Sequence, residues 1–297
     1  MQPQTHAQTA SRSSQITGAQ LVRREYRRYL TEPIDPRDPR IAAWRDALAT
    51  DGCAVLREFL DPDALARAER ECASIAHLAY ANERYTNCYD THDDPSLPDD
   101  HPIRLFMKRT QAFVARDRIP ESFVIHELYK LDGFRALIAA CLGEEHIYEY
   151  DDPFGALVVN VLEPGTTHPW HYDATEFVVS MMTRQPDGGG IFEYCPGIRS
   201  EGNENEHAVS RVIRGVDRQP IKQLDLRPGD LQLFKGRFSL HRVTPVEGSN
   251  SRHTVIFSYA KTPGMVGKSK RAKTLFGRVA DVHREADGKA HDDELID

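Results

Sequence analysis

The first part of the chain carries apolar residues at helical spacing. Between residues 38 and 50 they recur every three or four positions, and Asp38 followed by Pro39 is typical of a helix start. Gly52 then ends the segment before a run at residues 53–56 that has strand character. The pattern predicts a helix followed by a strand.

Two further helices are predicted before the middle of the chain. Residues 61–78 open with an acidic N-cap and a proline and carry a single apolar stripe. Residues 120–141 form the third stretch, and Gly143 follows in the position of a C-cap glycine. Residues 87–101 are rich in Asp, Pro and Thr without apolar periodicity, so we expect a functional loop there, such as a lid. The predicted helical part covers residues 38–143.

Beyond residue 143 the pattern changes to short strand-like runs separated by turn residues. These runs lie at residues 156–162, 176–182, 190–194, 231–235 and 254–260. Such a series predicts an all-β sandwich or jelly-roll core over residues 147–262. Residues 200–217 have little strand character and are interpreted as an insertion.

Composition and charge narrow the class of protein. With 297 residues, 40% hydrophobic and 28% charged, the chain has the composition of an ordinary globular protein, and we expect one domain over residues 21–280. Residues 1–20 are predicted to form a disordered tail and residues 281–297 a charged tail. The five cysteines show no CxxC spacing, which favours reduced thiols in the cytoplasm over disulfides or structural zinc.

The same numbers argue against several partners. A net charge of −7, with one short basic run near residue 270, gives no electrostatic footprint for nucleic acid. The N-terminus has neither a basic start nor an apolar run, so neither a signal peptide nor a membrane span is expected. A homodimer stays open.

One group of residues has the composition of a metal site. His171 and Asp173 are two residues apart, and at a strand end both project from the same side of the chain. His241, just past a predicted strand, is the candidate third ligand. Two histidines and one carboxylate form the facial triad of non-haem iron(II), which leaves coordination positions free. Arg252, eleven residues further on the next strand, offers a guanidinium to the distal carboxylate of a 2-oxo acid.

Each of these residues also has an ordinary interpretation. An HxD pattern arises by chance in many proteins, and a lone histidine is most often a surface or hydrogen-bonded core residue. Arg252 fits a surface position equally well when taken alone. The order of HxD, glycine-rich turn, Pro-Gly-Asp turn, His and Arg within a strand-rich half favours the metal site.

Four blocks of sequence carry a resemblance to a known family: residues 152–157 (DPFGAL), 171–177 (HYDATEF), 189–194 (GGIFEY) and the stretch from PGD at 228–230 to LHRVTPV at 240–246. In these blocks the chain resembles the iron(II)/2-oxoglutarate-dependent oxygenase superfamily, and within it the branch of radical halogenases acting on free amino acids and their hydroxylase relatives. The resemblance runs from about Trp44 to Arg278. It implies a mainly β fold with a helical N-terminal part and a double-stranded β-helix (jelly roll, cupin-like) core.

The resemblance implies a catalytic and metal-binding triad of His171, Asp173 and His241, with Fe(II), 2-oxoglutarate as cosubstrate and dioxygen. Halogenases of that branch have a small residue in place of the carboxylate ligand, which leaves room for chloride. This chain keeps Asp173, which favours hydroxylation of an unactivated C–H bond. Desaturation or cyclisation would use the same residues and stays open.

The branch also implies a small amino acid or amino-acid derivative as substrate. Candidate substrate-binding residues are His168, Arg104, Arg109 and Asp152, each of which is also compatible with an ordinary surface or salt-bridge role. Asn160, on the strand before His171, is a candidate contact for 2-oxoglutarate.

His168 is expected beside the substrate, where the branch resemblance implies a histidine that helps to hold polar groups. Pro169 favours an extended backbone, so two histidines three positions apart should project from opposite sides of the strand. A turn-capping role is the alternative for His168. For the whole chain, the alternatives are a non-catalytic jelly-roll metal- or ligand-binding protein and an oxygenase that works without 2-oxoglutarate.

Overall fold

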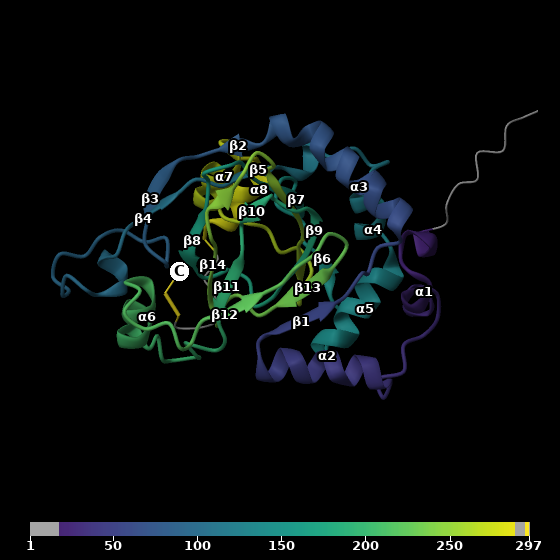
Figure 1. The fold of residues 1–297 in the computed structure, drawn as a ribbon, viewed down its shortest axis with the longest axis horizontal. Coiled ribbons are helices and arrows are strands. Elements are labelled where there is room, and N and C mark those ends of the chain that lie inside the picture. Colours follow the sequence, from purple (N-terminus) through teal and green to yellow (C-terminus); the bar gives the residue numbers. More distant parts are fainter. Residues whose placement is uncertain (1–17, 289–294, 297) are drawn as a thin grey trace, which may run out of the picture.

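Two antiparallel sheets face one another in the computed structural model, which describes residues 18–288 and 295–296 (Figure 1). The larger has the strand order β1-β13-β9-β16-β7-β5-β2: Cys53–Leu56 (β1), Leu231–Phe234 (β13), Val178–Arg184 (β9), Arg252–Phe257 (β16), Leu157–Leu162 (β7), Ala112–Val114 (β5) and Tyr80–Ala81 (β2). The smaller has the order β12-β11-β14-β8: Lys222–Leu224 (β12), Phe192–Cys195 (β11), Leu240–Val243 (β14) and His168–His171 (β8).

Three two-stranded ladders border these sheets. They pair Arg84–Thr86 (β3) with Met107–Arg109 (β4), Tyr148–Glu149 (β6) with Tyr259–Ala260 (β17), and Gly188–Gly189 (β10) with Val246–Glu247 (β15).

Helices cover the outer face of the larger sheet, and Figure 1 shows α1 to α5 gathered on that side. The α-helices are Arg24–Thr31 (α1), Pro39–Thr50 (α2), Pro62–Ile75 (α3), Val124–Tyr129 (α4), Asp132–Leu142 (α5), Glu206–Ile213 (α6), Ser269–Phe276 (α7) and Asp281–Ala286 (α8). Short 3-10 turns occupy Gly18–Leu21 (η1), Ala76–Leu78 (η2), Pro102–Arg104 (η3) and Arg116–Arg118 (η4).

Successive side chains along β7 and β16 point to opposite faces of the larger sheet. Val159, Val255 and Phe257 join the main apolar core beneath the helices. Leu162 points the other way and packs against Val243 and the partly buried Phe192 of the smaller sheet. The space between the sheets is therefore lined by the alternate residues of both.

Most of the expected elements are present. The helices predicted at residues 38–50 and 61–78 are α2 and α3, and the side chain of Asp38 accepts a hydrogen bond from the backbone of Arg40. The five predicted strands correspond to β7, β9, β11, β13 and the β16–β17 pair.

The third helix was predicted wrongly as one stretch. The chain turns between α4 and α5, so that α5 packs against α1 with Gly133 directly beneath the carbonyl of Leu30. The part expected to be helical also contains the short strands β2 to β5, and α1 precedes its predicted start. The expected insertion at 200–217 contains α6.

Both predicted tails need correction at the residues that the structure describes. Residues 18–20 belong to η1, and the rest of the expected N-terminal tail lies outside the described residues. Residues 281–286 form α8 instead of a frayed tail, because its His283 is fully buried and bonded to Asp152 through Nε2 at 3.1 Å. Among the helices described, none combines the length and apolar character that a bilayer crossing requires.

Candidate metal centre

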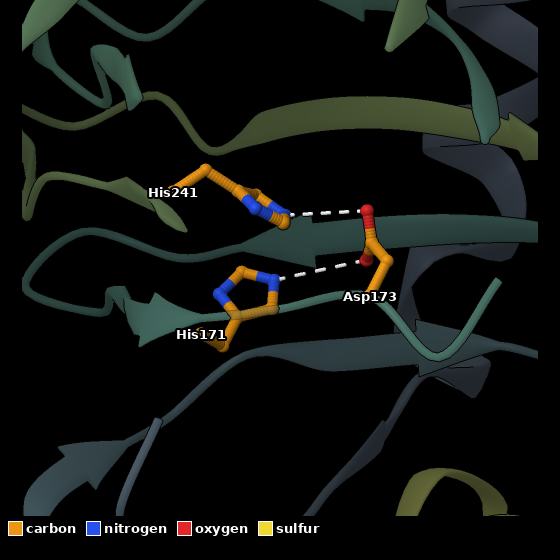
Figure 2. A group of neighbouring side chains, drawn as sticks. All are labelled: His171, Asp173 and His241. Carbon is orange, nitrogen blue, oxygen red and sulfur yellow. Dashed lines mark ion pairs between the residues drawn. The ribbon is translucent and has the colours of Figure 1, made fainter. Parts of the chain in front are cut away.

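Two strands of the smaller sheet bring the three candidate ligands together. His171 ends β8 and is the direct cross-strand partner of His241 on β14. Asp173 lies two residues past His171, where its backbone N–H donates to the carbonyl of Gly236 at 3.1 Å. Figure 2 shows the three side chains turned toward a common point. His241 lies within a strand, and not just past one as the sequence indicated.

The distances between these side chains suit a single divalent ion. One ligand atom from each of the three residues lies within 4.8 Å of the others. Nε2 of His241 is 3.4 Å from Oδ2 of Asp173, and Nε2 of His171 is 4.0 Å from Oδ1 (Figure 2). In the described part of the chain, this is the one cluster of His, Cys, Asp and Glu with such geometry.

Backbone carbonyls set the orientation of both imidazoles. Nδ1 of His171 lies 2.8 Å from the carbonyl of Pro169, and Nδ1 of His241 lies 2.9 Å from that of Ser239. A carbonyl accepts a hydrogen bond from the protonated Nδ1 and so leaves the lone pair on Nε2, which is how a histidine is prepared to bind a metal.

The local electrostatics favour the protonation states in which His171 and Asp173 bind a metal, a neutral imidazole and an ionised carboxylate. Burial, followed by the nearby His241, holds the pKa of His171 well below its ordinary value, so this imidazole is neutral near pH 7. Burial alone would raise the pKa of Asp173, but attraction and a hydrogen bond from His241, followed by His171 and Arg271, outweigh it and bring the pKa to about 2. A neutral imidazole beside a carboxylate is the donor set of a facial triad.

His168 lies on the same side of β8 as His171, contrary to the expectation from alternation. The two rings stack with centroids 3.6 Å apart and an interplanar angle of 15°. The cause is a β-bulge: His168 pairs with Val243 while His171 pairs with His241, so three steps on β8 match two on β14. The extra residue reverses the alternation, and Pro169 within the strand was the signal for it.

Arg109 comes from β4 and carries a buried positive charge near the triad. Burial, then repulsion from Arg84, lowers its pKa to about 9, while Asp90 and Asp173 act in the opposite direction. Arg84 is already bound by Asp90 through two hydrogen bonds, at 2.6 and 2.9 Å. Nε2 of His168 is also buried without a hydrogen-bond partner. Two polar groups beside the triad are therefore available to a ligand.

Arg252 faces the triad's sheet from the opposite side of the interior. It pairs with Leu162, and directly paired residues share a face, so its side chain points toward β14 and β11. Gly190 leaves room for its stem, since a Cβ there would lie 3.0 Å from Cδ of Arg252.

The guanidinium of Arg252 is buried without a carboxylate partner among the residues that the structure describes. Its side chain is almost fully buried, Nη1 donates to Oγ1 of Thr254 at 2.6 Å, and Nε has no partner. Burial lowers its pKa to about 10. A buried unpaired cation is costly, and a bound dicarboxylate would supply the missing acceptor. Asn160 is cross-strand partner to Thr254 on this face, and its amide donates to the carbonyl of Ala112 at 3.2 Å.

Two of the proposed substrate residues are engaged elsewhere. Arg104 binds Asp93, Asp99 and the carbonyl of Leu97, all within its own loop. The carboxylate of Asp152 accepts from three backbone N–H groups, those of Phe154, Gly155 and Gly267, and from the ring of His283. Asp152 therefore ties α8 to the start of β7, and its acceptor positions are filled.

A cluster behind the triad was not anticipated from the sequence. Tyr172, between two candidate ligands, stacks on Tyr89 of the expected functional loop, and the guanidinium of Arg199 lies 3.7 Å from its ring centroid. Arg199 is held by Glu204 and by the carbonyl of Ile296. No periodicity or motif marks Arg199, because its role depends on contacts between distant segments.

Comparison with known proteins places the chain in a family. The family model of halogenase D matches residues 37–274, whereas no curated protein matches significantly. The epimerase SnoN from nogalamycin biosynthesis, solved with Fe3+, alpha ketoglutarate and nogalamycin RO, has a similar structure (14% identity over 76% of this chain and 84% of that chain, TM-score 0.53). AviO1 from Streptomyces viridochromogenes Tue57 is similar too (20% identity, 78% and 97%, TM-score 0.50). At these identities the structural likenesses concern the fold, whereas the family match covers most of the chain. The chain therefore belongs to the halogenase D family, and it is an iron(II)- and 2-oxoglutarate-dependent oxygenase.

Proposed function

We propose that this oxygenase hydroxylates an unactivated C–H bond of a small amino acid or amino-acid derivative, within a core that is a double-stranded β-helix. The observation that carries the proposal is the placement of His171 and His241 on the smaller sheet, with Asp173 just past the end of β8, opposite the unpaired guanidinium of Arg252 on the larger sheet. A binding protein without catalysis has no need of an anion anchor facing a triad that leaves metal positions open.

In this proposal His171, Asp173 and His241 hold the iron through two Nε2 atoms and the carboxylate. Bound iron, together with 2-oxoglutarate and dioxygen, supplies the oxidising power for attack on a C–H bond. The protein's own contribution is to fix the ligands. The carbonyls of Pro169 and Ser239 hold the two imidazoles, and the backbone of Gly236 holds Asp173.

Arg252 would bind the distal carboxylate of 2-oxoglutarate. A guanidinium offers two parallel N–H donors to a carboxylate, and the low polarity around Arg252 strengthens that pair. Thr254 holds one end of the guanidinium, which restricts its orientation before the cosubstrate arrives. Asn160, on the same face, is the further candidate contact.

Asp173 decides between hydroxylation and halogenation, the two reactions that the family resemblance suggests. Halogenases of the related branch have a small residue at the carboxylate position, whereas this chain has an aspartate that points at both histidines (Figure 2). A carboxylate in that position leaves no place for chloride, so we infer hydroxylation despite the family's name.

Arg109 and His168 would bind the polar end of the substrate. Both lie partly buried next to the triad, and neither has a carboxylate within hydrogen-bond distance in the described part of the chain. The carboxylate of an amino acid would satisfy both at once, because the guanidinium and the imidazole each donate hydrogen bonds. Arg104 and Asp152 are no longer needed for this role, since their own contacts occupy them.

The test is turnover of a panel of amino acids and N- or C-blocked derivatives with iron(II), 2-oxoglutarate and air, followed by mass spectrometry and succinate assay. We expect a product that gains one oxygen atom, formed in proportion to succinate, from a substrate with a free carboxylate. Loss of two hydrogens would indicate desaturation or cyclisation instead. Absence of succinate release with every candidate, in a protein that binds iron(II), would contradict the proposal.

A further inference from the structure

Gly236 lies unusually close to the carboxylate of Asp173. It follows β13 in the segment that leads to His241, and its carbonyl accepts the backbone N–H of Asp173 at 3.1 Å. A Cβ placed on Gly236 would lie 1.7 Å from Oδ2, 2.6 Å from Cγ and 2.9 Å from Cβ of Asp173. The side chain of Asp173 therefore packs directly against the backbone of Gly236.

Rotation of Asp173 cannot relieve this contact. The position of its Cβ is set by the backbone, so a Cβ on residue 236 would meet it at 2.9 Å in every rotamer of the carboxylate. Gly236 is also absent from the glycines with positive φ, so alanine could adopt its backbone conformation. Space for Asp173, and not backbone freedom, is what requires glycine at this position.

The two segments have little freedom to separate. Arg237, next to Gly236, donates from Nη1 to the carbonyl of Ala174 at 3.2 Å, beside the bond between Asp173 and Gly236. Arg237 is itself almost fully buried. Two adjacent hydrogen bonds thus hold residues 173–174 against residues 236–237, and an added methyl group would have to break them or displace the carboxylate.

We infer that Gly236 is a positioning residue for the metal centre, because it provides the volume that a carboxylate at position 173 occupies. The inference rests on the proposed role of Asp173 as a ligand. Positions 173 and 236 share one space: with aspartate at 173, residue 236 must be glycine, whereas glycine at 173 removes the three nearest atoms that a Cβ at 236 would meet. The identity of the third ligand therefore depends on two positions.

A double-mutant comparison tests this coupling with the full chain. Wild type, Gly236→Ala, Asp173→Gly and the double variant are compared by calorimetric Tm of the metal-free protein and by anaerobic equilibrium dialysis with iron(II) alone. Gly288→Ala is the matched control, because a Cβ on Gly288 would meet no atom of the described residues within 4 Å and Gly288 has no positive φ. We expect Gly236→Ala to lower the Tm and to weaken iron binding by about 10- to 100-fold. In the Asp173→Gly background the same change should leave the Tm unaltered.

An equal loss of Tm from Gly236→Ala in both backgrounds would overturn the inference, since the glycine would then serve the fold and not the carboxylate. Unchanged iron affinity in Gly236→Ala would overturn it as well. Wild-type iron affinity in Asp173→Gly would instead refute the proposed ligand set. The Tm comparison would still report whether positions 173 and 236 share one volume.

Discussion

Replacing Arg252 by methionine should have opposite effects on the free protein and on cosubstrate binding. Burial lowers the pKa of Arg252 from 12.5 to about 10, which corresponds to about 3 kcal/mol of unfavourable free energy for the charged form in the folded protein. Loss of the hydrogen bond to Thr254 offsets about 1 kcal/mol of the stability gained by removing that charge. We therefore expect Arg252→Met to stabilise the metal- and ligand-free protein by about 2 kcal/mol.

The sign of the pH dependence follows from the same shift. The folded pKa lies below the unfolded one, so the penalty of the charged arginine is fully present below about pH 10 and fades as the pH rises toward 12.5. The stability difference between wild type and Arg252→Met should consequently be constant across pH 6 to 9, to about 0.5 kcal/mol. Urea unfolding at several pH values measures it.

Cosubstrate binding should respond in the other direction. Removal of one partner from a buried charge pair costs about 2–5 kcal/mol, or roughly 30-fold to several thousand-fold in the Kd of 2-oxoglutarate. At a concentration of about 100 times the wild-type Kd, 2-oxoglutarate should stabilise the iron-loaded wild type by about 2.7 kcal/mol but the variant by less than about 0.9 kcal/mol. Anaerobic unfolding with and without 2-oxoglutarate makes the comparison without relying on turnover.

Arg242→Met is the contrasting variant. Arg242 is already paired with buried Glu193 at 2.6 Å and stacked on Trp170, so its loss should destabilise the protein while leaving 2-oxoglutarate binding intact. Unchanged 2-oxoglutarate affinity in Arg252→Met would refute the anchor. Weakened affinity in Arg242→Met alone would assign it to Arg242.

Three further variants address the triad, the substrate and the C-terminal helix. His171→Ala or His241→Ala should abolish iron retention and turnover, because two remaining ligands hold a divalent ion poorly. Metal analysis of anaerobically loaded protein measures the iron retention, and full iron occupancy in either variant would rule out the ligand set. His168→Ala should keep its iron and still consume 2-oxoglutarate, while the ratio of oxidised substrate to succinate falls several-fold; an unchanged ratio would favour the turn-capping role. Asp152→Ala should lower the free energy of unfolding by about 3 kcal/mol or more, because His283 and three buried N–H groups lose their acceptor, and a Kd for iron equal to that of wild type would separate this structural role from the metal centre.

The parts of the fold that could be predicted are those with local signals. The helices at residues 39–50 and 62–75 begin with an aspartate and a proline, and the long strands of the larger sheet contain short apolar runs. The short strand β8 carries no such signal, since its four residues are His, Pro, Trp and His. Neither α8 nor the break before α5 could be foreseen, because buried contacts with distant residues, His283 with Asp152 and Gly133 with Leu30, determine them.

The candidate site shows the same division. The spacing of His171 and Asp173, together with the order of His241 and Arg252, was enough to select residues that the fold brings to one interior. The side on which His168 lies was predicted wrongly, because the alternation of side chains between the two faces of a strand is interrupted wherever a bulge adds a residue. Gly236 was passed over because a glycine required by the volume of a distant side chain looks, in sequence, like any turn glycine.

The contact between Asp173 and Gly236 also constrains the order in which this site could change during evolution. A chain with any side chain at position 236 cannot gain an aspartate at 173 in one viable step, because the new carboxylate would overlap that side chain. Glycine at 236 must come first, and it makes no steric clash with a small residue at 173. In the reverse direction, loss of the carboxylate meets no steric obstacle, and a later substitution at 236 then blocks its return. Conversion toward a smaller residue at 173 is therefore easy to begin and hard to undo.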